Sequence, residues 1–180
     1  MTVRLRTAHT ADLAPGDLRA VRGLLDTAFD GGFDDDDFEH CLGGIHALVH
    51  DGTGSLAAHG SVVMRRARHR DRWLRVGYVE AVGVRRDARR TGLGGRVMTA
   101  LERVIDGAYD LGALSASDSG ARLYADRGWQ PWTGGLHALS PNGIVHLPEE
   151  EGSTYVRPAL AGPLDPGPGL LFDWRDGDVL

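Results

Sequence analysis

A turn rich in glycine and arginine, RRTGLG at residues 89–94, is the first feature of this sequence that could do chemistry. It follows an apolar segment typical of a strand and precedes a segment with helical spacing. Its free backbone N–H groups would therefore meet the positive end of a helix dipole, a combination that can hold a pyrophosphate. The pattern is neither a dinucleotide fingerprint nor a P-loop, because G-x-G-x-x-G and a following Lys-Ser/Thr pair are missing. On spacing alone, an anion site and an ordinary glycine-rich connection are both open.

An acidic residue within an apolar strand is the second such feature. In GYVEAVGV, a period of two places four side chains on one face: Tyr78, Glu80, Val82 and Val84. Glu80 is then a carboxylate on a strand that otherwise reads as buried, where acids are rare. It could act as a general base. The alternative is a structural ion pair with a neighbouring arginine.

Charge is strongly clustered in this chain, although its formal net charge is only −5. Acidic runs occur at 34–37 (DDDD), at 149–151 (EEE) and in the terminal DWRDGDVL, and each run alone reads most simply as a solvated loop. Basic runs occur at 65–75 (RRARHRDRWLR) and around the glycine turn. This balance does not fit a protein that binds nucleic acid over its whole surface.

The elements that must position these residues follow from apolar periodicity. Strands are expected at 3–8, 45–50, 55–66, 73–84 and 112–116, and the last strands within 129–135 and 153–158. Helices are expected at 15–29, 97–108 and 117–128, with a short helix or loop at 33–42.

The order β-α-β-β-β-α-β-α-β predicts an α/β (α+β) fold with a mixed sheet flanked by helices. A length of 180 residues suits a single domain over 1–180 with one core. A Pro/Gly linker near 159–169 is expected to lead to a C-terminal tail.

Composition narrows the class of protein further. The apolar content of 42% fits a soluble globular chain, and no apolar run approaches the roughly 20 residues of a membrane span. The N-terminus lacks the apolar region of a secretory signal, and a lone Cys41 cannot form an internal disulfide. We therefore expect a cytoplasmic protein with no membrane partner. The spacings of the histidines match no common zinc pattern, so no metal is expected.

The glycine turn and the segments around it resemble a known family. Arg-x-x-Gly-x-Gly after the fourth strand resembles the acetyl-CoA signature of the GCN5-related N-acetyltransferases (GNAT). Five blocks, in order and over nearly the whole chain, resemble the aminoglycoside 2'-N-acetyltransferases: LGGIHALV, GYVEAVGV, GAYDLGALSAS, RLYADRGWQPW and DWRDGDV. The signature is moderately specific for the superfamily, and the five blocks are specific for the subfamily. The resemblance implies the GNAT fold, with a mixed, mostly antiparallel sheet flanked by helices.

By this resemblance the cosubstrate is acetyl-CoA, and no metal takes part. The backbones of Val82 and Val84, on either side of Gly83, would pair with the acetyl carbonyl and the pantetheine arm. The glycine turn would hold the pyrophosphate through seven consecutive residues: Arg89, Arg90, Thr91, Gly92, Leu93, Gly94 and Gly95.

The implied reaction is direct acetyl transfer to the 2'-amino group of an aminoglycoside, which gives antibiotic resistance. Glu80 would be a remote general base that relays a proton through water, and Tyr124 would be the acid that protonates the CoA thiolate. From the residues alone, a tyrosine that packs on the sheet is the favoured interpretation of Tyr124, and only the resemblance of the LY…RGW block reverses this preference. Ser115 would contact substrate or water. No G-x-S-x-G elbow is present, and Cys41 has no visible activating partner, so no acetyl-enzyme is expected.

The acidic runs gain a purpose in this interpretation, because carboxylates spread around a polycationic sugar both steer and hold it. The family pattern matches Asp37, Glu150 and Asp178 as substrate contacts, with Glu80 and the Ala81 carbonyl nearest the reacting amine. Two positions where the substrate would lie depart from that pattern. Gly32 stands where the family often has Asp, and Leu180, itself matched to a substrate-binding position, stands where it often has an aromatic residue. Kasugamycin is therefore an alternative substrate. A homodimer is compatible with the resemblance.

Two rival functions stay open. A GNAT enzyme that acetylates a polyamine or a protein terminus would also use an acidic pocket. A nucleotide-sensing or nucleic-acid-binding module could use the basic run 65–75, although its alternation suits a solvated β-hairpin and no recognition helix is nearby. With the aminoglycoside reading, no nucleic-acid partner is expected.

Overall fold

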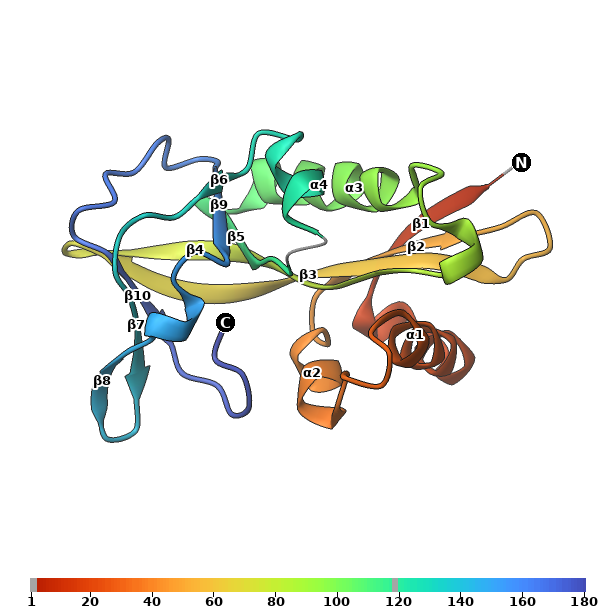
Figure 1. Ribbon diagram of the computed structural model, residues 1–180, viewed down its shortest axis with the longest axis horizontal. Helices are drawn as coiled ribbons and strands as arrows, with labels where there is room; N and C mark the ends of the chain where they lie inside the picture. The colour runs from red at the N-terminus through yellow and green to blue at the C-terminus, as the bar shows by residue number, and fades with distance from the viewer. Residues whose placement is uncertain (1–2, 118–119) are drawn as a thin grey trace. The chain divides into compact units, whose positions relative to one another are not determined.

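The structure is a computed structural model and describes residues 3–117 and 120–180 (Figure 1). Its strands are β1 Arg4–His9, β2 Ile45–His50, β3 Leu56–His69, β4 Arg72–Val84, β5 Leu111–Ser115, β6 Gln130–Pro131, β7 Leu136–Ser140, β8 Gly143–His146, β9 Thr154–Pro158 and β10 Leu170–Asp173. Its α-helices are α1 Pro15–Ala28, α2 Asp35–His40, α3 Leu93–Ala108 and α4 Ala121–Ala125. Short 3-10 turns lie at Thr10–Asp12, Arg86–Ala88 and Pro148–Glu150.

The described residues form two compact units. The first unit contains residues 3–63 and 79–103, and the second contains 64–78, 104–117 and 120–180. β3, β4 and α3 each contribute residues to both units. The expectation of a single domain is not decided by this division and stays a prediction.

In the first unit, β2 pairs antiparallel with both β1 and β3. The registers align Leu5 with Val49 and Ile45 with Val62, and a bulge interrupts the pairing with β3 at Val49/His50. These strands confirm the segments expected at 3–8, 45–50 and 55–66. The alternation of apolar residues in them gives the sheet two faces, each of which a helix can cover.

Helices cover both faces of the first unit's sheet, with α1 and α2 on one side and α3 on the other (Figure 1). α1 begins at Pro15, as expected from a residue suited to the first helical position, and it buries Val21, Leu24 and Leu25. α3 packs so closely on β3 that a Cβ at Gly60 would lie 2.7 Å from Val97 Cγ1. Glycine at this position therefore lets the helix approach the strand.

The second unit contains a mixed sheet as well. β5 pairs in parallel with Val76–Tyr78 of β4 and antiparallel with β9, which also pairs with β6. β10 pairs antiparallel with β3 at Ala67 and Arg68 and in parallel with β7, which pairs antiparallel with β8. The predicted mixed, mostly antiparallel sheet flanked by helices is confirmed.

Three strands of the structure were not expected from the sequence. β7 and β8 form a hairpin over residues 136–146, and β10 lies within the segment expected to be a tail. The linker over 159–169 is irregular, as expected. The helix expected at 117–128 is shorter, at Ala121–Ala125, and residues 118 and 119 of that expectation lie outside the described residues.

Candidate functional site

The glycine turn connects a strand to a long helix, as its sequence predicts. β4 ends at Val84 and α3 begins at Leu93. Arg90 and Gly92 have positive φ angles of 60° and 84°, so the chain reverses sharply before the helix. The N–H of Arg96 donates to the Gly92 carbonyl at 3.1 Å. The backbone N–H groups of the preceding first turn have no partner within the helix, which makes them suited to an anion.

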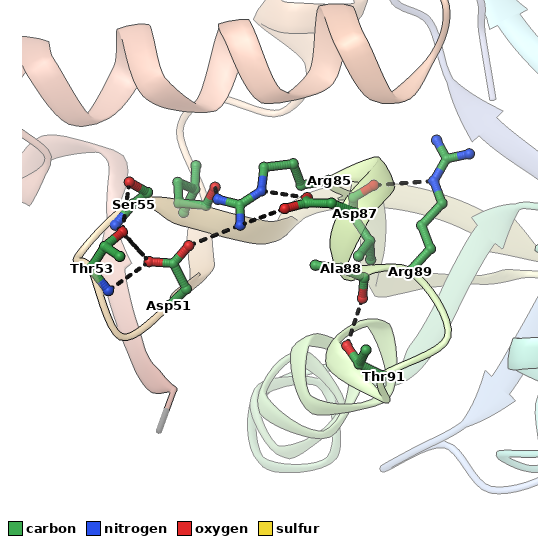
Figure 2. A network of polar contacts seen from close by, with 10 residues as sticks. Asp51, Thr53, Ser55, Arg85, Asp87, Ala88, Arg89 and Thr91 are labelled. Carbon is green, nitrogen blue, oxygen red and sulfur yellow. Dashed lines mark hydrogen bonds and ion pairs between the residues drawn. The ribbon is translucent and has the colours of Figure 1, made fainter. Parts of the chain in front are cut away.

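A network of polar contacts stiffens the approach to this turn (Figure 2). Arg85 donates to Asp87 at 2.7 Å and to Asp51 at 2.9 Å, and these bonds raise the pKa of Arg85. Asp51 also accepts from Thr53 and Ser55, and hydrogen bonds from Thr53 and Arg85 lower its pKa. The β2–β3 connection is thereby tied to the 3-10 turn Arg86–Ala88, which leads into the glycine turn.

A cavity of about 520 Å³ lies beside this network, lined by Val3, Asp51, Gly52, Thr53, Arg85, Asp87, Ala88, Thr91, Leu93 and Arg96. Two of its lining residues, Thr91 and Leu93, belong to the turn expected to hold the pyrophosphate. The Thr91 hydroxyl donates to the Ala88 carbonyl at 2.6 Å. That bond fixes the loop rather than reaching toward a ligand.

The side chain of Arg89 holds the shape of the turn by bonding two backbone carbonyls. Its guanidinium donates to the Val84 carbonyl at 3.3 Å and to the Ala28 carbonyl, at the end of α1, at 2.9 Å (Figure 2 draws the first of these bonds). Arg90 and Gly92 are exposed, whereas Leu93 is buried. Among the expected cofactor residues of the turn, Arg89 and Thr91 thus hold its shape through side-chain bonds, and Arg90 and Gly92 are exposed.

The strand that carries Glu80 is not regular. Ala81 has φ 52°, a left-handed conformation that a non-glycine residue rarely adopts, and it interrupts the alternation expected for Tyr78, Glu80, Val82 and Val84. Ala81 packs against the cluster under α1, as does the backbone at Gly83, whereas Val82 lies against Gly60 beside α3. A Cβ at Gly77 would meet Ile105 of α3, so Gly77, an odd position, faces the same helix as Val82, an even one. The expectation of one face shared by all four side chains is therefore wrong, because the pleat is broken between these positions, where Ala81 is left-handed.

Glu80 is half-buried, and its charge acts on Cys41. Burial of the thiol, reinforced by this charge, raises the pKa of Cys41 to about 12. The thiol is therefore fully protonated at neutral pH, and a thiolate nucleophile is not available there.

Asp37 has a structural partner that the sequence did not indicate. Its Oδ2 accepts from the Asp34 N–H at 3.0 Å while Asp34 Oδ1 accepts from the Asp37 N–H at 2.9 Å. This reciprocal pair is a capping box at the start of α2. A substrate contact through Asp37 would have to share its carboxylate with that cap.

Three of the expected substrate residues lie together in the second unit. Ser115 Oγ donates to Glu150 Oε2 at 3.1 Å, and the Tyr78 hydroxyl lies 3.1 Å from the same Ser115 oxygen. Burial raises the pKa of Glu150, and the charge of Asp178 raises it further. Asp178 itself is exposed.

Tyr124 is 8% exposed and lies in α4. Its ring packs edge-on against Trp129 and tilted against Tyr155. Burial raises the pKa of its hydroxyl to about 12, so the group carries its proton across the physiological pH range.

The C-terminal tail is fastened by a buried arginine from β3. Arg65 donates to the Asp173 side chain, to the Asp173 carbonyl and to the Val179 carbonyl. The adjoining Leu180 is 7% exposed. Arg65 was expected to belong to a solvated hairpin, and that expectation is wrong because the tail covers it.

Three other arginines of the basic run are also paired within the second unit. Arg70 bonds Asp165 at 2.6 Å, and Arg72 and Arg75 both bond Asp110. The run forms the hairpin between β3 and β4, as expected, with His69 and Arg72 at its ends. Carboxylates thus neutralise much of the charge that a nucleic-acid module would need.

Two further observations concern ligands and membranes. Within 3–117 and 120–180, no group of three or more His, Cys, Asp or Glu side chains is placed to hold a metal ion. In the same described part of the chain, no helix has the length and apolar character needed to cross a bilayer.

Known proteins resemble this chain in sequence. Residues 18–129 match the family described as the Acetyltransferase (GNAT) family. Over 178 residues the chain is 48% identical to an aminoglycoside 2'-N-acetyltransferase of Mycolicibacterium fortuitum, a match that covers 97% of this chain and 90% of that protein.

Solved structures resemble it in fold. The GNAT family N-acetyltransferase YhbS from Escherichia coli, in complex with CoA, aligns with a TM-score of 0.65 at 16% identity and covers 97% of this chain and 90% of its own. Escherichia coli ElaA aligns with a TM-score of 0.59 at 16% identity, and the alignment covers 87% of this chain and 99% of ElaA. At these identities the likeness concerns the fold alone.

Proposed function

The chain belongs to the acetyltransferase (GNAT) family, and from this premise we propose that it transfers the acetyl group of acetyl-CoA to the 2'-amino group of an aminoglycoside. One observation carries the proposal: the 48% identity to an aminoglycoside 2'-N-acetyltransferase continues over 97% of the chain, well past the family match that ends at residue 129. The part of the match beyond residue 129 includes Glu150, one of the carboxylates assigned to the substrate.

The glycine turn is assigned to the pyrophosphate of acetyl-CoA. The N–H groups in the first turn of α3 would supply donors, and the exposed Arg90 would supply charge. Arg89, which bonds two backbone carbonyls, holds the shape of the turn. We assign the backbones around Gly83, from Val82 to Val84, to the acetyl carbonyl and the pantetheine arm.

Acetyl transfer to an amine needs a neutral amine, a polarised thioester carbonyl and a proton for the departing thiolate. Aminoglycoside amines are largely ammonium ions at neutral pH, so we assign Glu80 as the base that accepts this proton through water. Tyr124 is assigned as the acid, and its high pKa keeps the hydroxyl protonated until the thiolate leaves. The protonated Cys41 thiol supports direct attack over an acetyl-enzyme.

The substrate half of the reaction is assigned to carboxylates. Glu150, with Ser115 bonded to it and Asp178 acting on it, forms an acidic group suited to an ammonium ion. Asp37, Ala81 and Leu180 are assigned as further contacts. Asp37 also caps α2, and the Ala81 carbonyl accepts from His59, so both contacts would be shared with structural bonds.

The test measures CoA release with a panel of amines. Gentamicin, tobramycin and kasugamycin carry a 2'-amino group and should turn over, whereas amikacin and kanamycin A carry a 2'-hydroxyl and should not. Mass spectrometry and NMR of the product should place one acetyl group on the 2'-nitrogen. Acetylation at a 3- or 6'-amine, or turnover confined to spermidine, would overturn the proposal.

A further inference from the structure

Two histidines with fully buried rings form a chain of hydrogen bonds inside the first unit. His46 lies in β2 and His59 in β3, and both are 0% exposed. Thr10 Oγ1 lies 2.8 Å from His46 Nε2, and His46 Nδ1 lies 2.9 Å from His59 Nε2. The chain ends where His59 Nδ1 lies 3.0 Å from the Ala81 carbonyl oxygen.

The protons of this chain can be arranged in one direction only. A carbonyl oxygen accepts and cannot donate, so His59 must carry its proton on Nδ1. In a neutral ring, His59 Nε2 then carries no proton and accepts a hydrogen bond from the Nδ1–H of His46. His46 Nε2 in turn accepts from the Thr10 hydroxyl, whose oxygen accepts the Gly43 N–H at 2.8 Å.

Both rings are neutral, as this arrangement requires. Burial lowers the pKa of His46 and of His59 far below neutrality. A second proton on His59 would place its Nε2–H against the Nδ1–H of His46 at 2.9 Å. A second proton on His46 would lie on Nε2 and would force the Thr10 hydroxyl to turn its proton to the Gly44 carbonyl, at 3.4 Å. The chain is therefore a fixed, uncharged structure throughout the range in which the enzyme would work.

The acceptor at the end of this chain is the unusual residue of β4. Ala81 adopts the left-handed conformation at φ 52°. The next peptide bond, between Ala81 and Val82, is planar and trans, so its C=O and N–H point in opposite directions. Whatever holds the Ala81 oxygen therefore also sets the direction of the Val82 N–H.

We propose that His59, oriented by His46, is a positioning residue that fixes the Ala81–Val82 peptide and thereby aims the Val82 N–H at the thioester carbonyl. This inference rests on the proposed function, which assigns the Val82 backbone to that carbonyl. Donors that are held in place before the reaction stabilise the developing oxyanion without reorganising. The histidines act through the backbone and do not touch the substrate.

A proton relay does not fit the same geometry. A relay needs a group at its end that can take up and pass on a proton, and the chain ends on a backbone carbonyl. The base assigned here, Glu80, is not a member of the chain of bonds that runs from Thr10 to Ala81.

Two amide substitutions at His59 separate positioning from general stability. The asparagine amide nitrogen can replace Nδ1, so His59→Asn should keep the bond to Ala81. The glutamine amide occupies the place of Nε2 instead, so His59→Gln should lose that bond. His59→Gln should then lower kcat by about 10²–10³-fold with little change in the KM for acetyl-CoA, and His59→Asn should restore most of the rate. Val49→Ala, equally buried in β2, is the control for lost stability and should keep its kcat.

A measurement without turnover completes the test. In the ¹⁵N NMR spectrum of the wild-type protein, both rings should be neutral with the proton on Nδ1, and the Val82 amide signal should shift in His59→Gln and not in His59→Asn. A charged ring, a proton on Nε2 of His59, or equal kcat in both variants and wild type would overturn the inference. If the wild type acetylates no aminoglycoside but the NMR pattern holds, the proposed function fails while the fixed peptide stands. If a His59 variant does not fold, the tautomers of His46 and His59 in the wild-type protein still test the inference, because it requires both rings to be neutral with the proton on Nδ1.

Discussion

Ser115 Oγ lies 3.1 Å from Oε2 of Glu150, and this bond holds a half-buried carboxylate at the end of β5. Ser153 adds a weaker contact at 3.4 Å. Even with these donors, burial raises the pKa of Glu150, and the charges of Asp178 and Glu149 raise it further. A carboxylate kept where its charge is disfavoured costs stability, which is typical of a group retained for binding.

Replacing Glu150 should therefore separate stability from function. Glu150→Gln keeps the shape and removes the charge, so at neutral pH we expect a higher melting temperature and a higher KM for a cationic aminoglycoside. kcat should change less, if the carboxylate binds the ground state and the transition state equally. Thermal melts and steady-state kinetics check both effects, and Glu39→Gln, an exposed glutamate whose charge is not among those acting on Glu150, is the control.

The effect on stability should depend on pH in a defined direction. A folded-state pKa above the unfolded value contributes stability that is present at low pH and is lost as pH rises through the folded pKa. Glu150→Gln should consequently melt at a higher temperature than the wild type at pH values above the folded-state pKa of Glu150. This difference in melting temperature should disappear at pH values below the ordinary titration range of glutamate. A melting temperature lower than that of the wild type at neutral pH would contradict this account.

The glycine turn should tolerate no side chain at Gly92. Its φ of 84° is strained for any β-branched residue. Acetyl-CoA at one hundred times its dissociation constant should stabilise the wild type by roughly 2.7 kcal/mol, and Gly92→Val should lose this stabilisation. Gly107→Val in α3, where an added Cβ meets nothing within 4 Å, is the matched control. A full thermal shift in Gly92→Val would mean that the pyrophosphate binds elsewhere.

The sequence predicts much of this fold because most of its elements have strong local signals. Pro15 begins a helix with clear apolar periodicity, and the strands of the first unit alternate. β10 was missed because Leu170–Asp173 is short and follows a Pro/Gly segment, so only its pairing with β3 and β7 makes it a strand. Such long-range pairing leaves little trace in local sequence.

The candidate site was predicted less completely, for a different reason. The glycine turn carries its own signature, but the left-handed Ala81 arises in a stretch, VEAVGV, that reads as regular strand. His46 and His59 were considered only as metal ligands, since their sequence spacing does not reveal that the rings meet across the register of β2 and β3. In the sequence, Arg65 cannot be distinguished from the exposed arginines near it, because it is buried only by the C-terminal tail, which is distant in sequence.

Tyr124→Phe should slow acetyl transfer while leaving acetyl-CoA binding nearly unchanged. Only the proton for the departing thiolate is lost, and general acids of this kind contribute about 10²–10⁴-fold. Tyr155→Phe removes a hydroxyl from the ring packed beside it and is the control. Single-turnover kinetics measure the chemical step even where product release limits kcat. An unchanged single-turnover rate would remove the acid assignment.

Glu80→Gln should lower kcat/KM most at the acid end of the pH profile. Unprotonated amine is scarcest there, so the reaction depends most on a base. At high pH the free amine is abundant and the loss should shrink. Profiles measured with a 2'-amino aminoglycoside check this, with the exposed Glu39→Gln as control. Parallel profiles for Glu80→Gln and wild type would contradict a base role.

Arg65 should be the residue on which the order of the C-terminal tail depends most. Its side chain is 5% exposed, and its guanidinium lies 5.4 Å from the Tyr78 ring centre while bonding Asp173 and the Val179 carbonyl. Arg65→Met would fill similar space but leave these acceptors without their donor, at a cost of about 1–3 kcal/mol for each acceptor that stays buried. Faster hydrogen exchange over the tail should accompany the lower melting temperature.

Arg65→Lys should recover only part of the loss, because an ammonium group cannot reproduce the three fixed bonds of the guanidinium. Arg66→Met, at the exposed neighbouring position, should melt close to the wild type. Since Asp178 and Leu180 follow in the same tail, Arg65→Met should also raise the KM for the aminoglycoside and leave that for acetyl-CoA almost unchanged. A tail that exchanges as slowly in Arg65→Met as in the wild type would show that other contacts hold it.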